Sequence, residues 1–146
     1  MAQDLKTLIV LFKAYQSMIN QVKLSLINTD LTVNEFTALE ALYSKKELTT
    51  SELRDYVLVP NSSMTYVLDT LEKKELIKRE KAVDDKRIQL LSLTNKGNDL
   101  FKESYEVHFK HMRKFFNELD SHEEKALQDY LKRIGKIAQN DFQNKT

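Results

Sequence analysis

Short polar side chains follow the one proline of the chain, Pro60, and precede an apolar helical stripe. Proline lacks a backbone N–H and is tolerated near a helix start, so we expect a helix to begin at residue 60 or 61. Hydroxyl and amide groups in its first turns would bond to base edges in the major groove of DNA, and its free N–H groups favour phosphate. Alternatively, Asn61 and Ser62 could do no more than cap the helix. The candidate DNA contacts on this helix are Asn61, Ser62, Ser63, Thr65 and Tyr66.

Positive charge collects after these polar residues, although the whole chain has a formal net charge of only +1. Residues 73–87 contain seven cations and four anions, enough for several contacts to phosphate, and we select Lys73, Lys86 and Arg87 as candidates. An arginine at the tip of a strand ribbon can enter the narrow minor groove. Asp85, two residues before Arg87, can orient the guanidinium. A charge run of this kind could instead be a solvated surface.

Two short helices would position these side chains. A capping-box pattern, Thr49 with Glu52, predicts a helix with Leu53, Tyr56 and Val57 facing inward. Thr50 lies at its start and is a further candidate DNA contact. The next helix would extend to about residue 74 and bury Met64, Val67, Leu68 and Leu71. Two short helices joined by a turn of about four residues form a helix-turn-helix unit.

The segment after residue 74 changes its apolar period. Leu76 and Ile77 lead into the charged residues 78–81, residues 88–93 are rich in strand formers, and a polar turn at 83–87 lies between them. This pattern predicts a two-stranded ribbon with a charged tip, a wing. Apolar steps of three and four predict four long helices: over residues 5–27, from Thr32 with a capping box to Glu35, from a cap at Thr94, and from a box of Ser121 with Glu124.

The first helix and the last two have broader apolar faces than one chain covers, and a twofold dimer would bury the remainder. A monomeric helical bundle is the alternative. We therefore expect a mainly α fold with a small β wing, a winged helix-turn-helix dimerised through its N- and C-terminal helices. The expected parts are an N-terminal dimerisation helix (1–31), a DNA-binding domain (32–93) and C-terminal dimerisation helices (94–146).

The composition argues against several functional classes. Cysteine is absent, which excludes a disulfide framework and a thiolate nucleophile. The two glycines, Gly97 and Gly135, cannot form a glycine-rich phosphate loop, so we expect no enzyme, and we expect neither a cofactor nor a metal. No apolar run approaches the ~20 residues of a membrane span, and the first residues do not resemble a secretion signal. We expect a cytoplasmic protein.

The stretch from Asp85 to Gly97 resembles the wing signature of the MarR family of bacterial transcriptional regulators. That signature is D-x-R, three residues, L-x-L-T, two residues and G, and every fixed position is present. Helix order and chain length are also similar to the family, and residues 71–77 resemble the end of its recognition helix. The resemblance implies a dimer that binds a palindromic operator in double-stranded DNA and represses nearby genes. It further implies release of the DNA when a small lipophilic or phenolic ligand binds.

The chain departs from the family pattern at three places. Tyr66 and Thr70 occupy positions that are often basic, Glu75 stands where the recognition helix usually ends with glycine, and residues 58–60 replace small turn residues. The first departure weakens any base contact carried over to those two positions, and the others affect turn geometry.

Two further sets of residues leave alternatives open. Five side chains at helical spacing could line a ligand pocket or could belong to the core: Tyr15, Phe36, Tyr43, Met112 and Phe116. His108 and His111, three residues apart, allow a zinc-responsive regulator of the same fold, but the first two helices contain no histidine or cysteine to complete the site. A helical protein-interaction module without operator binding is the other alternative.

Overall fold

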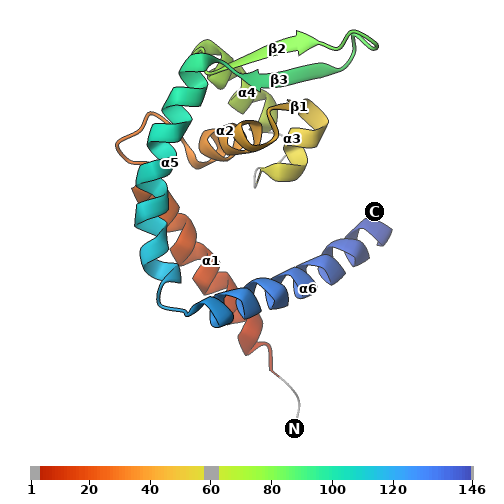
Figure 1. Ribbon diagram of the computed structural model, residues 1–146. Helices are drawn as coiled ribbons and strands as arrows, with labels where there is room; N and C mark the ends of the chain where they lie inside the picture. The colour runs from red at the N-terminus through yellow and green to blue at the C-terminus, as the bar shows by residue number, and fades with distance from the viewer. Residues whose placement is uncertain (1–3, 58–62, 146) are drawn as a thin grey trace. The chain divides into compact units, whose positions relative to one another are not determined.

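The computed structural model describes residues 4–57 and 63–145, and the chain divides into two compact units, Met1–His111 and Met112–Thr146. Along the chain (Figure 1) the elements are α1 (Lys6–Ser25), α2 (Val33–Lys45), β1 (Glu47–Thr49), α3 (Thr50–Tyr56), α4 (Met64–Lys73), β2 (Ile77–Lys81), β3 (Gln89–Leu93), α5 (Asn95–Phe116) and α6 (Ser121–Lys145). The mainly α fold with a small β wing is thereby confirmed. Within the described ranges, none of the helices has the length and apolarity that crossing a membrane requires.

The small sheet has three antiparallel strands in the order β1-β3-β2, one strand more than the predicted ribbon. β2 and β3 form the wing, with Ile77 opposite Leu93 and Lys81 opposite Gln89. The additional strand β1 pairs its Leu48 with β3. Because β1 has only three residues, its sequence shows no alternation that would distinguish it from a loop.

One hydrophobic core joins α2, α3, α4, the sheet and the start of α5 in the first unit. Leu39 of α2 and Leu91 of β3 are fully buried there. The prediction that Tyr56 faces inward is wrong: it is 50% exposed, because α3 ends at this residue and the buried face of the turn is taken by Leu53 and Val57. The inward face predicted for α4 is confirmed by the burial of Met64, Val67, Leu68 and Leu71.

Capping boxes start α2 and α3 as predicted. The hydroxyl of Thr32 accepts the N–H of Glu35 at 3.1 Å, and that of Thr49 accepts the N–H of Glu52 at 3.1 Å. Both glutamates return the bond to the backbone N–H of the threonine. Each box therefore satisfies two backbone groups that the start of a helix leaves without partners.

The box predicted for α6, Ser121 with Glu124, is wrong by one residue. Asp120 and Glu123 exchange the two bonds instead, each at 2.9 Å. A carboxylate binds a backbone N–H more strongly than a hydroxyl does, so Asp120 takes the capping position. Glu124 is then free to pair with Arg113 at 2.7 Å.

The C-terminal end of α4 closes in a turn that usually requires glycine. The N–H of Leu76 donates to the carbonyl of Leu71, and the N–H of Glu75 donates to that of Glu72, each at 2.9 Å. This pair of bonds is the Schellman motif, and it places Glu75 in the left-handed region at φ 62°. The chain thus forms this left-handed turn with a residue whose Cβ disfavours it.

Glu75→Gly is expected to raise the free energy of unfolding by about 1 kcal/mol, the scale of the left-handed penalty that glycine avoids. Glu75→Ala is the matched control, because it removes the carboxylate but keeps the Cβ. Urea denaturation followed by circular dichroism measures both variants. Equal stability of the two would show that Glu75 is not strained in this turn.

Gly97 of α5 lies close to the backbone of Leu76, the residue just before β2. A Cβ added to Gly97 would be 2.0 Å from the carbonyl oxygen of Leu76. That oxygen also accepts the N–H of Thr94 at 3.1 Å. The backbone of α5 can approach this carbonyl only if residue 97 has no side chain, which gives the physical reason for the last fixed position of the wing signature.

Gly97→Ala should therefore destabilise the fold by about 3 kcal/mol, because a backbone atom blocks the added methyl group. Gly135→Ala in α6 is the matched control, since nothing lies within 4 Å of its Cβ position. The control should be stabilised by up to about 1 kcal/mol through helix propensity. Thermal unfolding of both variants tests this, and a Gly97→Ala protein as stable as the wild type would contradict it.

Candidate nucleic-acid interface

The exposed side of α4 carries the polar residues that can reach DNA. Tyr66 is 75% exposed, and Thr65 and Lys73 are also exposed. Ser63 is half-buried just before the helix. In the major groove of DNA, such hydroxyl, phenol and ammonium groups can bond to base edges and phosphates.

Of three other predicted contacts, two lie outside the described residues and one has a buried hydroxyl group. Asn61 and Ser62 lie outside the described residues, as does the expected start of the helix at residue 60 or 61. Thr50 begins α3, but its hydroxyl oxygen is buried and has no hydrogen-bond partner within the described ranges. This orientation does not present the Thr50 hydroxyl to an outside ligand.

The wing tip holds Arg87 in a fixed orientation. The Arg87 guanidinium donates from Nε and Nη2 to the two carboxylate oxygens of Asp85, both at 3.0 Å, and the Arg87 backbone N–H donates to the same carboxylate. Two backbone hydrogen bonds close the turn: the N–H of Ile88 donates to the Asp85 carbonyl, and the N–H of Ala82 donates to the Ile88 carbonyl. The Arg87 side chain is nevertheless 90% exposed, so it is oriented and accessible at once.

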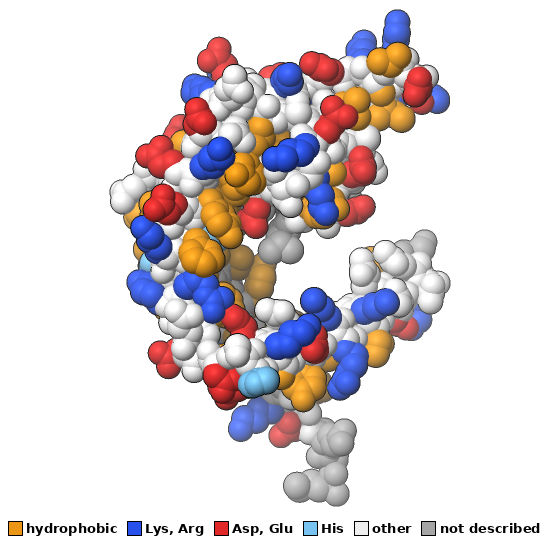
Figure 2. Space-filling model, viewed as in Figure 1, with side chains coloured by type: hydrophobic (Ala, Val, Ile, Leu, Met, Phe, Trp, Pro, Cys, Tyr) orange, Lys and Arg blue, Asp and Glu red, His pale blue; other side chains and the backbone are white. Residues whose placement is uncertain are grey.

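The electrostatic effect of this pair is mutual. Hydrogen bonds from the Arg87 side chain and backbone lower the pKa of Asp85, and the carboxylate raises the pKa of Arg87. Both groups stay charged at neutral pH. In solvent such a pair adds little stability, so its effect is on geometry. Basic, acidic and hydrophobic side chains all appear at the outer end of the wing in Figure 2.

Two cations of the predicted positive run form ion pairs with acidic side chains of the same lobe. The Lys74 ammonium donates to both carboxylate oxygens of buried Glu35, at 3.0 and 3.2 Å. Arg79 of β2 pairs with acidic residues of α4. Three exposed lysines form no ion pair within the described part of the chain: Lys73, Lys81 and Lys86. Lys81, at the outer end of β2, is a candidate contact that the sequence showed only as part of a charged run.

The two histidines of α5 bind to α1 rather than to each other. His108 Nδ1 lies 2.8 Å from the Ser25 hydroxyl, and His111 Nε2 lies 2.8 Å from Gln21 Oε1. Burial lowers the pKa of His108, and its electrostatic interaction with the neighbouring His111 side chain lowers it further. Within residues 4–57 and 63–145, no group of three or more histidine, cysteine or acidic side chains is placed to hold a metal ion. The zinc-responsive alternative therefore finds no ligand set there.

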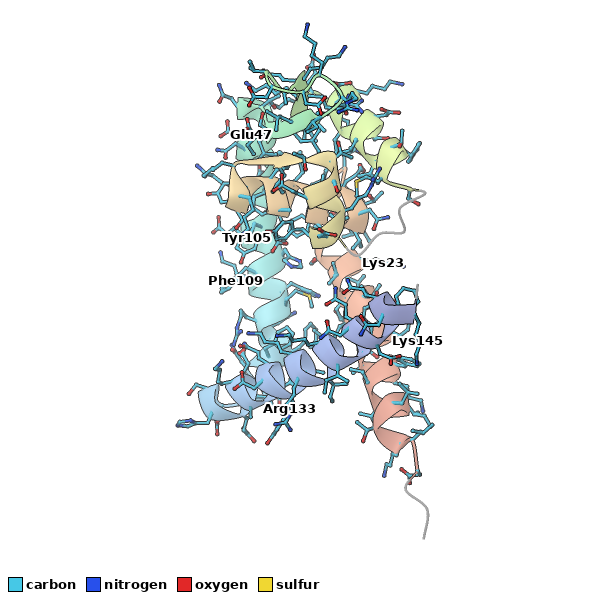
Figure 3. All side chains as sticks on the ribbon, turned by 90° about the vertical axis from the view of Figure 1, so that its right-hand side faces the viewer. Lys23, Glu47, Tyr105, Phe109, Arg133 and Lys145 are labelled. Carbon is cyan, nitrogen blue, oxygen red and sulfur yellow. The ribbon has the colours of Figure 1, made fainter. Side chains whose placement is uncertain are left out.

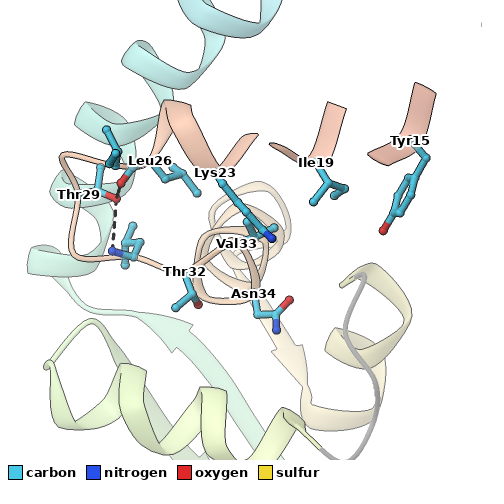
Figure 4. A pocket seen from close by; sticks show the side chains of 10 residues that line it. Tyr15, Ile19, Lys23, Leu26, Thr29, Thr32, Val33 and Asn34 are labelled. Carbon is cyan, nitrogen blue, oxygen red and sulfur yellow. Dashed lines mark hydrogen bonds between the residues drawn. The ribbon is translucent and has the colours of Figure 1, made fainter. Parts of the chain in front are cut away.

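A cavity of about 550 Å³ lies between α1 and the start of α2, and Figure 4 shows the side chains that line it. Tyr15, Ile19 and Lys23 come from one face of α1, at spacings of four residues. Figure 3 labels Lys23 on this helix. Thr32 and Asn34 add polar groups from the start of α2. Lys23 was not among the predicted pocket residues, although its helical spacing from Tyr15 places both on one face of α1.

Of the five side chains proposed for a pocket, the three in the first unit do not line one cavity. Tyr15 lines the cavity, whereas Phe36 is fully buried in the core and contacts the rings of Phe101 and His108, at centroid distances of 5.5 and 4.8 Å. Tyr43 packs on Phe101 at 4.9 Å. The ring series continues along α5 through Tyr105 and Phe109, labelled in Figure 3. Met112 and Phe116 belong to the second compact unit.

Comparison with known proteins shows to which family the chain belongs. Residues 31–89 match the MarR family. Over 143 residues the chain is 32% identical to the HTH-type transcriptional regulator MhqR of Bacillus subtilis, an alignment that covers 98% of each chain. The chain belongs to the MarR family. As a MarR-family protein it is a DNA-binding transcriptional regulator and not an enzyme.

Solved MarR-type structures have the same fold. BpsR of Bordetella bronchiseptica, whose DNA binding is regulated by 6-hydroxynicotinic acid, aligns with a TM-score of 0.80 at 20% identity, covering 89% of this chain and 98% of that one. A MarR variant from E. coli complexed with operator DNA aligns with a TM-score of 0.73 at 23% identity, covering 90% and 99%. The predicted winged helix-turn-helix fold is thereby confirmed.

Proposed function

We propose that this MarR-family regulator is a cytoplasmic, homodimeric repressor that binds a palindromic operator through α4 and the wing, and that a small ligand releases it. The orientation of Arg87 carries the proposal for DNA binding. Arg87 is held by Asp85 at the tip of a two-stranded ribbon and is exposed, as an arginine must be to enter the minor groove.

The second DNA contact in this proposal is α4 in the major groove. Thr65 and Tyr66 are its base-edge contacts, and Lys73 and Lys86 bind phosphate. The same role for Asn61, Ser62 and Ser63 stays a prediction, and for Thr50 it would require the buried hydroxyl to turn outward. Operator DNA in a complex with the E. coli MarR variant supports a duplex as the partner.

A second copy of the chain is the partner for the exposed apolar faces. Within their own units, α1 and α6 leave most of their large hydrophobic side chains exposed, and no residue of α6 is buried. We assign 1–31 and 94–146 to dimerisation and 32–93 to DNA binding. The exposed residues include Leu8, Ile9 and Phe12 of α1 and Tyr130, Ile134 and Ile137 of α6. Patches of this extent mark protein interfaces, and a twofold dimer is the commonest closed assembly.

The cavity between α1 and α2 is the proposed ligand site. Its apolar walls fit a small aromatic ring, and the Lys23 ammonium and the Tyr15 hydroxyl can bind an acid or phenol group. Regulation of BpsR by 6-hydroxynicotinic acid, a hydroxylated aromatic acid, supports this ligand class.

Fluorescence anisotropy with DNA from the protein's own promoter region tests operator binding at ~50 and ~200 mM salt. We expect tight binding that resists random competitor DNA and weakens steeply with salt. Arg87→Ala should weaken it by ~1–3 kcal/mol, the scale of one lost contact. Lys102→Ala, which removes one exposed cation from α5, is the matched control and should bind as the wild type does.

Light scattering on the same samples should give twice the chain mass of 17.1 kDa. A monomeric mass would contradict the dimer. An affinity for the folded Arg87→Ala variant equal to that of the wild type would remove Arg87 from the interface. Absence of any preferred site after selection from random sequences would contradict operator binding itself.

Titration of the DNA complex with 6-hydroxynicotinic acid and 4-hydroxybenzoic acid tests the ligand site. At least one acid should release the DNA, and Lys23→Met should raise the concentration required about tenfold, because a charged hydrogen bond is lost. Lys13→Met, on the same helix but outside the cavity, is the matched control. Release that is unaffected by Lys23→Met would place the ligand elsewhere, and no release by either acid would contradict the proposed ligand class.

A further inference from the structure

The helix proposed to enter the major groove carries two acidic side chains on its exposed surface. Asp69 and Glu72 lie three residues apart on α4 and therefore share one face, which we call the acidic row. Their side chains are 59% and 47% exposed. When α4 and the wing are counted together, residues 64–87 hold seven cations and six anions. Unless it is compensated, the acidic row repels a phosphate backbone.

Arg79 of β2 is directed at this row and not outward. Side chains alternate between the two faces of a strand, so Arg79 shares a face with buried Ile77, while Lys78 and Glu80 occupy the opposite face. The Arg79 side chain is 17% exposed, against 59% for that of Lys78. Its partner across the ladder is Leu91, which is fully buried. The guanidinium is thus held between the sheet and α4.

One nitrogen of Arg79 binds both acidic residues. Nη2 donates to Asp69 Oδ1 at 2.6 Å and to Glu72 Oε1 at 2.8 Å. The hydrogen bond from Arg79 lowers the pKa of Glu72, so this carboxylate keeps its charge at neutral pH. The two carboxylates are thereby bound to a cation of the wing, on the side of α4 that faces β2.

We propose that Arg79 is a positioning residue for DNA binding, which neutralises the acidic row of α4 and holds it against β2, and that it is not a phosphate contact. The inference rests on the proposed function, in which α4 enters the major groove. Arg79 has the residue type of a phosphate contact and lies in the positive run. Its inward direction and its two carboxylate partners give it this other role.

A set of four variants separates the two roles. Arg79→Gln removes the cation, Asp69→Asn with Glu72→Gln removes the acidic row, and the triple variant removes both. Arg79→Lys keeps the charge but not the forked geometry of the guanidinium. Operator affinity is measured by anisotropy at several salt concentrations, and urea denaturation of each protein shows how much of it is folded.

If Arg79 neutralises the acidic row, Arg79→Gln weakens operator binding about tenfold. The triple variant then recovers an operator affinity within about threefold of the wild type. The slope of log affinity against log salt stays unchanged, because no phosphate contact is lost. Arg79→Lys retains most of the affinity. A merely structural role would lower the unfolding midpoint, and the affinity of the folded protein would not recover in the triple variant.

Two further outcomes overturn the inference. A phosphate contact would make Arg79→Gln lower the salt slope by about one, with the loss persisting in the triple variant. Unchanged affinity in Arg79→Gln would show that the acidic row does not face DNA. Wild-type protein without a preferred DNA site in the same assay would instead count against the proposed function, so the two failures are distinguishable.

Discussion

The backbone of Leu76 connects α4, the wing and α5. The Leu76 N–H closes the end of α4 by donating to the Leu71 carbonyl, and the Leu76 carbonyl oxygen accepts the N–H of Thr94 and lies against Gly97 at the start of α5. The Thr94 hydroxyl also donates to the carbonyl of Glu75 at 2.7 Å. The direction of the wing relative to α4, and the point from which α5 leaves the lobe, are therefore set within a few residues. Every proposed contact of the wing with DNA depends on this junction.

The family signature can be understood from this geometry. Asp85 and Arg87 form the clamp at the wing tip, and Leu91 and Leu93 belong to the strand that pairs with both of its neighbours. Thr94 caps α5 by accepting the N–H of Gly97 at 3.0 Å. Apart from Arg87, the fixed positions build the wing and attach it to the lobe. The side chains that would read bases, such as Tyr66, lie outside the signature, so the signature identifies the fold without identifying the operator.

The sequence predicted those features that depend on neighbours along the chain. Apolar periodicity located the long helices and the wing, and the boxes at Thr32 and Thr49 have the predicted bonds. The three-residue strand β1 was missed because its partner, β3, lies about 40 residues further along, a pairing that no local pattern shows. The pairing of Arg79 with α4 could not be predicted from the sequence for the same reason, because only the folded chain brings this strand residue next to the helix. Asp120 rather than Ser121 caps α6, because its carboxylate is the stronger hydrogen-bond acceptor. The spacing of residues along the sequence does not show which of two neighbouring residues is the stronger acceptor.

Counting charges along the sequence overstates the attraction of this lobe for DNA. The excess of three cations in residues 73–87 includes Lys74, which is bound to buried Glu35, and Arg79, which is bound to two carboxylates of α4. Arg87, which is paired with Asp85, remains exposed at the surface, as do three lysines that form no ion pair within the described residues. With so small a net charge, long-range attraction alone cannot supply the affinity for DNA. The affinity must therefore come from the placement of a few side chains at the spacing of the grooves, which in the proposed function are those of α4 and the wing.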